Sequence, residues 1–188
     1  MLLSFLSLSS SQKQSNPISP GQSTQENPSG KGVLHLADVV SAEVRSRMMS
    51  GIRSKNTKPE LAIRRGLHAR GFRFRLHPDN VPGKPDLVMP HYHAAIFVNG
   101  CFWHRHDCHL FKMPSTRPEF WSQKIERNVQ RDAIVRQELE ETGWRHFIVW
   151  ECALKGRMRL APEEVIERCA RWLHGEERAG EIVAGGTC

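Results

Sequence analysis

Apolar residues recur with a helical period in the segment that precedes the middle of the chain. An apolar residue at every fourth position from Val44 predicts a helix over residues 41–53. A second helix should begin after Thr57, because Thr57 and Glu60 have the spacing of a capping box. Gly71 is placed to end this helix, since glycine readily adopts the left-handed conformation that follows many helices.

The same period predicts two more helices further along the chain. Residues 119–141 should form a long helix with one apolar stripe, which consists of Trp121, Ile125 and Val129, and Gly143 should end it. Pro162 opens a last helix, because proline suits the first helical position. Its inward-facing residues are expected to be Val165, Cys169 and Trp172.

Four shorter apolar segments between these helices read as strands. Residues 72–76 alternate apolar and basic side chains, which predicts a strand with one positive face. Residues 85–89 and 94–98 should pair as a hairpin at the centre of the sheet, and residues 145–151 should form a fourth strand. Strands interleaved with long helices indicate an α/β fold with a mixed sheet flanked by helices.

The two ends of the chain lack these patterns. From residue 9 to residue 32, twenty of 24 positions are Ser, Gln, Asn, Pro, Gly or Thr, a composition that cannot bury enough surface to fold. We expect residues 1–40 to be a disordered extension or an over-long gene start, residues 41–174 to be one domain, and residues 175–188 to be a flexible tail. No basic residue precedes the short apolar start, so a secretory signal is not expected.

The distribution of charge indicates what the protein could bind. The 188 residues carry a formal net charge of +7, and residues 41–75 hold ten Lys and Arg against two Glu. Such a local excess favours a polyanion, and nucleic acid is the first candidate, although a solvated basic face has the same composition. No apolar segment reaches the roughly 20 residues of a membrane span, so we expect a soluble protein that does not bind membranes.

A dense group of Cys and His residues follows the third predicted strand. Zinc takes Cys and His ligands in tetrahedral sites, and the spacing here allows one loop to surround an ion. Five candidates compete for four positions: Cys101, His104, His106, Cys108 and Cys152. The spacing leaves open which histidine is the fifth. A surface loop that is merely rich in histidine is the alternative.

Asp86 suggests a second, harder ion such as Mg²⁺. It stands at the start of a predicted buried strand, where a carboxylate is costly unless it is paired or binds a metal. In the predicted hairpin, Val98 and Asn99 can lie beside it. A Pro-Asp pair is also frequent in turns, which is the alternative reading. A histidine left over from the zinc set could serve there as a general base.

Aromatic residues adjoin these polar groups. Phe102 and Trp103 lie within the Cys/His loop, and Trp121 lies near the start of the long helix. Core packing explains such residues in most proteins. The functional alternative is a wedge that is inserted between base pairs of DNA.

Three motifs carry a resemblance to a known family. Residues 82–86 read Pro-Gly-Lys-Pro-Asp, residues 96–104 read Ile-Phe-Val-Asn-Gly-Cys-Phe-Trp-His, and residues 150–156 read Trp-Glu-Cys-Ala-Leu-Lys-Gly. In this order they closely resemble the very short patch repair (Vsr) mismatch endonucleases, and the likeness runs in register over residues 41–173. The resemblance implies a restriction-endonuclease-like fold and an Mg²⁺-dependent enzyme that nicks DNA on the 5′ side of the thymine in a T:G mismatch. Such mismatches arise when 5-methylcytosine deaminates.

The resemblance also implies roles for the candidate residues. Asp86 would bind the catalytic Mg²⁺, expected as two ions, with the main-chain carbonyl of Val98, and His104 would be the general base or proton shuttle. The structural zinc ligands would be Cys101, His106, Cys108 and Cys152. The residues that intercalate beside the mismatch would be Phe102, Trp103 and Trp121.

Three further positions qualify this match. Glu60 falls on a family position near the catalytic metal, which competes with its capping role, and Asp132 falls on a position with a supporting role at most. Asn99 replaces a His or Asp that is usual in the family, and an amide cannot take up a proton as those side chains can. We therefore expect a reduced rate or an altered pH dependence.

The resemblance also implies binding partners, and the residues leave rival functions open. The resemblance implies double-stranded DNA as the partner of a monomer in the bacterial cytoplasm, at the nucleoid, with a cytosine methyltransferase or mismatch-repair proteins as further partners. The rivals are a nuclease that acts on unmodified or other DNA and a zinc-stabilised DNA-binding module without catalysis. A catalytic zinc hydrolase is disfavoured, because four Cys and His ligands would close the coordination shell.

Overall fold

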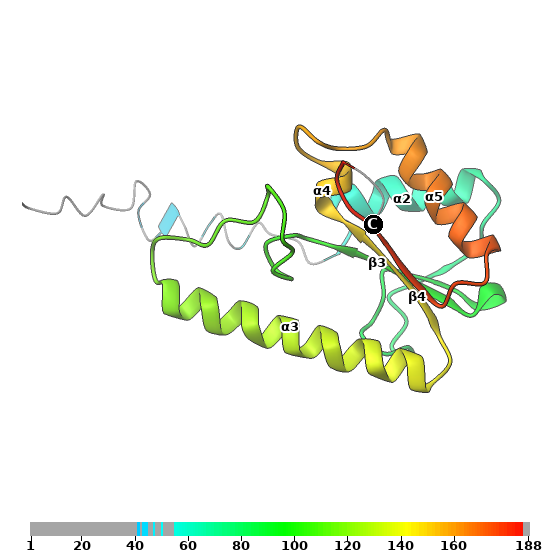
Figure 1. The fold of residues 1–188 in the computed structure, drawn as a ribbon, viewed down its shortest axis with the longest axis horizontal. Helices are drawn as coiled ribbons and strands as arrows, with labels where there is room; N and C mark the ends of the chain where they lie inside the picture. Colours follow the sequence, from blue (N-terminus) through cyan, green and yellow to red (C-terminus); the bar gives the residue numbers. More distant parts are fainter. Residues whose placement is uncertain (1–40, 42, 45–46, 48–49, 51–54, 186–188) are drawn as a thin grey trace, which may run out of the picture. The chain divides into compact units, whose positions relative to one another are not determined.

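The computed structural model describes residues 41, 43–44, 47, 50 and 55–185 (Figure 1). The predicted extension over residues 1–40 and most of the predicted helix over residues 41–53 lie outside this part of the chain. Among the described residues, no helix combines the length and the apolar character that a membrane span requires.

Five strands form one mixed sheet in the order β1-β2-β3-β4-β5. The β1–β2 and β2–β3 pairs are antiparallel, whereas the β3–β4 and β4–β5 pairs are parallel. The strands are β1 (Arg75–Leu76), β2 (Leu87–Met89), β3 (Ala94–Asn99), β4 (Arg145–Trp150) and β5 (Ala179–Ile182). The predicted hairpin of β2 and β3 is confirmed, and the short 3-10 helix η1 (Pro90–Tyr92) connects its strands.

Helices cover both faces of this sheet (Figure 1). They are α2 (Lys58–Ala69), α3 (Pro118–Glu141), α4 (Glu151–Leu154) and α5 (Pro162–His174). The capping box predicted for α2 is present in both halves: the Glu60 N–H donates to Thr57, and the Thr57 N–H donates to Glu60. The mixed α/β architecture with flanking helices is therefore confirmed.

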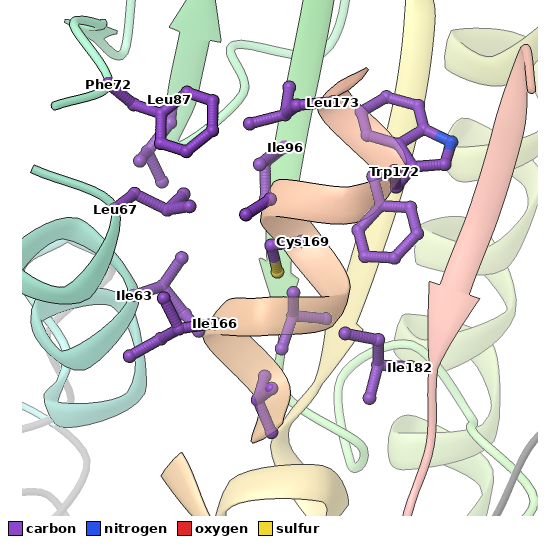
Figure 2. Packing of buried hydrophobic residues seen from close by; sticks show 14 of the residues in the cluster. Ile63, Leu67, Phe72, Leu87, Ile96, Ile166, Cys169, Trp172, Leu173 and Ile182 are labelled. Atoms are coloured by element: carbon purple, nitrogen blue, oxygen red, sulfur yellow. The ribbon is translucent and has the colours of Figure 1, made fainter. Parts of the chain in front are cut away.

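The larger core lies between the sheet and the pair of helices α2 and α5 (Figure 2). Val165, Cys169 and Trp172 of α5 are buried as predicted. The two helices approach closely at Gly66, where an added Cβ would lie only 2.0 Å from Cδ1 of Ile166. A smaller core on the opposite face packs Val88, Ala95 and Leu139 between the sheet and α3.

Two predictions about strands need correction. The segment 175–188 was expected to be a tail without regular structure, but residues 179–182 form β5 along the edge of the sheet. Ile182 is the only buried residue of this strand, and the strand's sequence lacks the alternation of apolar and polar residues by which a strand is predicted. The strand predicted over residues 72–76 pairs only at Arg75–Leu76, because Phe72 turns into the core instead.

Candidate metal centres and active site

The parallel register of β3 and β4 brings two distant segments to one edge of the sheet. Asn99 pairs with Trp150, so the two chain segments leave the sheet side by side. Cys101 and Cys152 each lie two residues beyond this pair, and the Cys152 N–H donates to the Cys101 sulfur at 3.3 Å. The loop after β3 folds back on itself, because the His106 N–H donates to the Cys101 carbonyl.

Four Cys and His side chains converge at this edge. Each of Cys101, His106, Cys108 and Cys152 offers one ligand atom, and these atoms all lie within 4.8 Å of one another. Of the two candidate histidines, His106 belongs to this group and His104 does not. The three cysteines are free thiols.

The chemistry of this donor set fits a zinc ion. Burial raises the pKa of the Cys101 and Cys152 thiols above the ordinary range, so thiolates form here only beside a cation. Three sulfur donors and one imidazole are a usual set for a structural zinc, and they complete a tetrahedral shell. A further backbone N–H, from Ala184, donates to the Cys152 sulfur at 3.4 Å.

Trp150 supports the histidine of this group. Its indole stacks on the His106 ring with 4.1 Å between ring centroids and 12° between planes. Its Nε1–H donates to Glu181 of β5 at 2.7 Å, which fixes the indole in place. Burial lowers the pKa of His106, which keeps the imidazole in the neutral form that a metal requires.

Asp86 lies just before β2, on the side of the hairpin where β3 ends. Its Oδ2 accepts a hydrogen bond of 2.7 Å from the Val98 N–H, and its side chain is only 19% exposed. Burial raises the pKa of this carboxyl group, although the Val98 hydrogen bond and the charge of Arg64 oppose the shift. A partly desolvated carboxylate of this kind is stabilised by a nearby cation, which fits a hard metal ion.

Glu60 and His77 stand beside Asp86. One ligand atom from each of the three residues lies within 4.8 Å of the others. Glu60 is 1% exposed and forms an ion pair with Arg64, while it also completes the capping box of α2. Sequence reasoning missed His77, because no spacing pattern links this residue to the other two.

His104 faces α3 rather than the cysteines. Its Nδ1 lies 2.5 Å from Oδ2 of Asp132, and both side chains are about one-fifth exposed, at 19% and 20%. A carboxylate at this distance holds the proton on Nδ1 and leaves Nε2 free to accept another. One cavity of about 600 Å³ is lined by five of the candidate residues: Asp86, Val98, Asn99, His104 and Asp132.

The three candidate intercalating residues form one aromatic group beside this cavity. Ring centroids are 5.1 Å apart for Phe102 and Trp103, 5.4 Å for Phe102 and Trp121, and 6.1 Å for Trp103 and Trp121. The Lys124 ammonium lies 5.3 Å from the Trp103 ring. All three rings are half-buried and lie outside the buried cores, so they are not simply core residues.

Together these features define a class of protein. A mostly buried carboxylate and a His–Asp pair share one cavity, and a Cys/His group that could hold a metal ion lies in the adjoining loop. Aromatic rings in edge-on and tilted contact lie next to them, and Trp103 lines a second pocket together with His104 and Asn99. This combination suits metal-assisted hydrolysis of a substrate that aromatic side chains can stack against.

Comparison with known proteins identifies the family. A family model described as DNA mismatch endonuclease Vsr matches residues 37–110. The DNA mismatch endonuclease Vsr of Escherichia coli (strain K12) is 44% identical over 151 residues, which cover 80% of this chain and 97% of that protein. The type II nicking enzyme V.XorIIP of Xanthomonas oryzae pv. oryzae is 45% identical over 130 residues, with 66% and 96% covered. The chain belongs to the Vsr family of DNA mismatch endonucleases.

Proposed function

We propose that this protein nicks one strand of duplex DNA on the 5′ side of the thymine in a T:G mismatch, and thereby starts repair of deaminated 5-methylcytosine. Family membership supports a mismatch-directed nicking endonuclease. The observation that carries the proposal is the shared cavity of Asp86, His104 and Asp132 beside the aromatic group. A restriction-endonuclease-like core is the fold that fits this family and the mixed sheet.

Asp86 and the Val98 carbonyl would hold Mg²⁺, expected as two ions. The N–H and C=O of a strand residue point to the same side, so the Val98 hydrogen bond to Asp86 supports a carbonyl directed toward the same space. Mg²⁺ stabilises negative charge on phosphate oxygens and eases the ionisation of water. Zn²⁺ would be held by Cys101, His106, Cys108 and Cys152, with a structural role.

His104 would accept the proton of the attacking water at Nε2. Its Nδ1–H is held by Asp132, which orients the ring and stabilises the imidazolium that forms. Asn99 lines the same cavity and can hydrogen-bond to water or phosphate, but it cannot take up a proton. Glu60 supports the site through its contacts with Arg64 and His77.

Phe102, Trp103 and Trp121 would be inserted beside the mismatch. Unstacking costs a few kcal/mol per base step and is easiest at a mispair, so stacking residues favour mismatched sites. Basic residues would contribute a grip on phosphates that does not depend on sequence. We propose that the enzyme acts as a monomer in the bacterial cytoplasm, alongside a cytosine methyltransferase and mismatch-repair proteins.

Strand nicking on matched duplexes tests this proposal. End-labelled DNA with one T:G pair in several methylation contexts would be compared with its T:A and C:G parents, with and without added Mg²⁺. Omission of Mg²⁺ is preferable to chelation, because a chelator would also remove zinc. Asp86→Ala should abolish the nick and leave DNA binding intact.

Asp79→Ala is the matched control, since Asp79 is 85% exposed and pairs only with Lys84 among the described charged residues. It should nick as the parent does. Cleavage of matched DNA would favour a nuclease with another substrate. Tight, salt-sensitive binding without Mg²⁺-dependent nicking would instead indicate a DNA-binding module.

A further inference from the structure

His77 lies between the two carboxylates of the acidic group. Its Nε2 is 3.1 Å from Glu60 Oε1, and its Nδ1 is 3.8 Å from Asp86 Oδ1. The side chain is 13% exposed, so solvent has little access to it. The residue stands at φ +45°, in the left-handed region, where the backbone turns after β1. The ring is therefore held at a sharp turn that aims it at the site.

Arg64 determines which ring nitrogen of His77 carries the proton. Arg64 Nη2 lies 2.8 Å from His77 Nε2, and a guanidinium can only donate hydrogen bonds. Glu60 Oε1 also lies 3.1 Å from Nε2, but this oxygen is itself paired with Arg64, so the guanidinium can donate to both groups. The shorter contact with Arg64 therefore makes Nε2 an acceptor and leaves the proton on Nδ1, the nitrogen nearer to Asp86. Arg64 is itself fixed by the Asn56 side chain at 2.6 Å and by the ion pair with Glu60.

The two oxygens of Asp86 thus face different N–H groups. Oδ2 accepts from the Val98 backbone at 2.7 Å. Oδ1 faces Nδ1 of His77 at 3.8 Å, which is longer than a hydrogen bond. A closure of less than about 1 Å would form that bond, and hydrogen bonds in active sites are often long before substrate and metal bind.

We propose that His77 is a positioning residue for Asp86: its Nδ1–H, directed by Arg64, restrains Oδ1 so that the carboxylate is oriented for a divalent ion. This inference rests on the proposed role of Asp86 as a metal ligand. Hydrogen-bonded partners of a metal-ligating carboxylate orient it, and their loss typically reduces metal affinity or activity by about 10- to 100-fold.

Direct ligation of the metal by His77 is the alternative, because one of its nitrogens lies within 4.8 Å of the ligand atoms of Glu60 and Asp86. The contact with Arg64 disfavours it. The lone pair of Nε2 is used by the guanidinium, and Nδ1 carries the proton, so neither nitrogen has a free lone pair for an ion.

Binding of Mn²⁺ to the full, zinc-loaded chain tests the proposal without DNA. Electron paramagnetic resonance would measure free and bound Mn²⁺ for the parent, His77→Leu and His77→Gln, with Asp86→Ala as the reference for lost binding. We expect the Leu variant to bind at least about tenfold more weakly. The Gln variant should bind within about threefold of the parent, because its amide offers an acceptor to Arg64 and a donor to Asp86.

His91→Leu is the control, since His91 is an exposed histidine of η1. It should bind Mn²⁺ as the parent does. Equal affinity of the Leu variant and the parent would overturn the proposal, and so would a Gln variant as weak as the Leu variant. A nitrogen hyperfine coupling on bound Mn²⁺ that the Leu variant removes would show direct ligation instead.

Long-range proton–nitrogen NMR of the parent protein provides a test that does not depend on any variant folding. The neutral Nδ1–H tautomer of His77 is expected, and an Nε2–H tautomer would overturn the argument. Because both measurements omit DNA, they separate this inference from the proposed function. Failure to nick T:G duplexes would leave the Mn²⁺ result standing.

Discussion

Replacement of Asp132 by asparagine tests how the His104 ring is held. The carboxylate lies 2.5 Å from Nδ1, so it accepts the Nδ1 proton and leaves Nε2 unprotonated toward the cavity. An asparagine amide at the same place can donate to Nδ1. It would then stabilise the other tautomer, in which Nε2 carries the proton and cannot accept one from water.

The burial of the His104–Asp132 pair sets the size of the expected loss in nicking rate. Both side chains are about four-fifths buried, so the bond to the ionised carboxylate is only partly screened. A hydrogen bond to a charged group is worth roughly 1.5–3 kcal/mol, which corresponds to about a 10- to 150-fold loss of rate for Asp132→Ala. Asp132→Asn should lose more, up to about 10⁴-fold, because it holds the wrong tautomer in place.

Single-turnover nicking of a T:G duplex at saturating Mg²⁺ measures both variants. Glu126→Gln is the matched control, since Glu126 also lies on α3 and pairs with the loop residue Arg105 at 3.4 Å, but at exposed positions. The control should react at the parent rate. An Ala variant as slow as the Asn variant would refute the tautomer argument, and full activity in both would refute any role of Asp132 in the reaction.

Three more perturbations have definite expected outcomes. Asn99→His should raise the nicking rate at least about tenfold and change its pH profile, and unchanged kinetics would contradict the idea that Asn99 limits this enzyme. Cys108→Ala should lose its zinc and melt about 10 °C lower or more, whereas Cys169→Ala, a buried thiol of the core, should keep zinc by metal analysis. Burial lowers the pKa of His146 below its ordinary value of 6.5. The folded protein therefore holds this histidine neutral, and below about pH 6.5 the unfolded chain binds a proton that the folded protein does not. The free energy of unfolding should then fall on acidification by up to about 1.4 kcal/mol per pH unit. His146→Leu should flatten the decline in melting temperature between about pH 7.5 and 5.5, and an equally steep decline would count against this assignment.

Features that depend on neighbouring residues could be predicted from the sequence. The capping box of Thr57 and Glu60 and the hairpin of β2 and β3 are both set by short-range spacing. The four-residue metal group could be predicted only as four of five candidates. The choice of His106 over His104 depends on where α3 packs, because Asp132 of α3 engages His104.

Features that depend on long-range packing could not be predicted in this way. His77 reaches Glu60 and Asp86 only because β1 ends in a left-handed turn beside α2. The strand β5 buries one apolar residue, and its Glu181 side chain accepts a hydrogen bond from the Trp150 indole. Polar contacts of this kind carry no periodicity, so neither hydrophobic pattern nor local propensity indicates them.

Trp150 connects the Cys/His group to the proposed active site. Its ring stacks on His106 of the metal group and meets the His104 ring edge-on at 6.3 Å. From residue 100 to residue 110 the loop contains turns and bends but no helix or strand, and ordering each residue costs about 1–2 kcal/mol. Aromatic contacts of Phe102 and Trp103 with Trp121 order one part of this loop. A metal ion held by Cys101, His106 and Cys108 would order the remainder and offset that cost. Because His104 lies within the span that these ligands fix, the zinc would act on catalysis through the order of the loop, while its closed set of four protein ligands leaves no position for substrate.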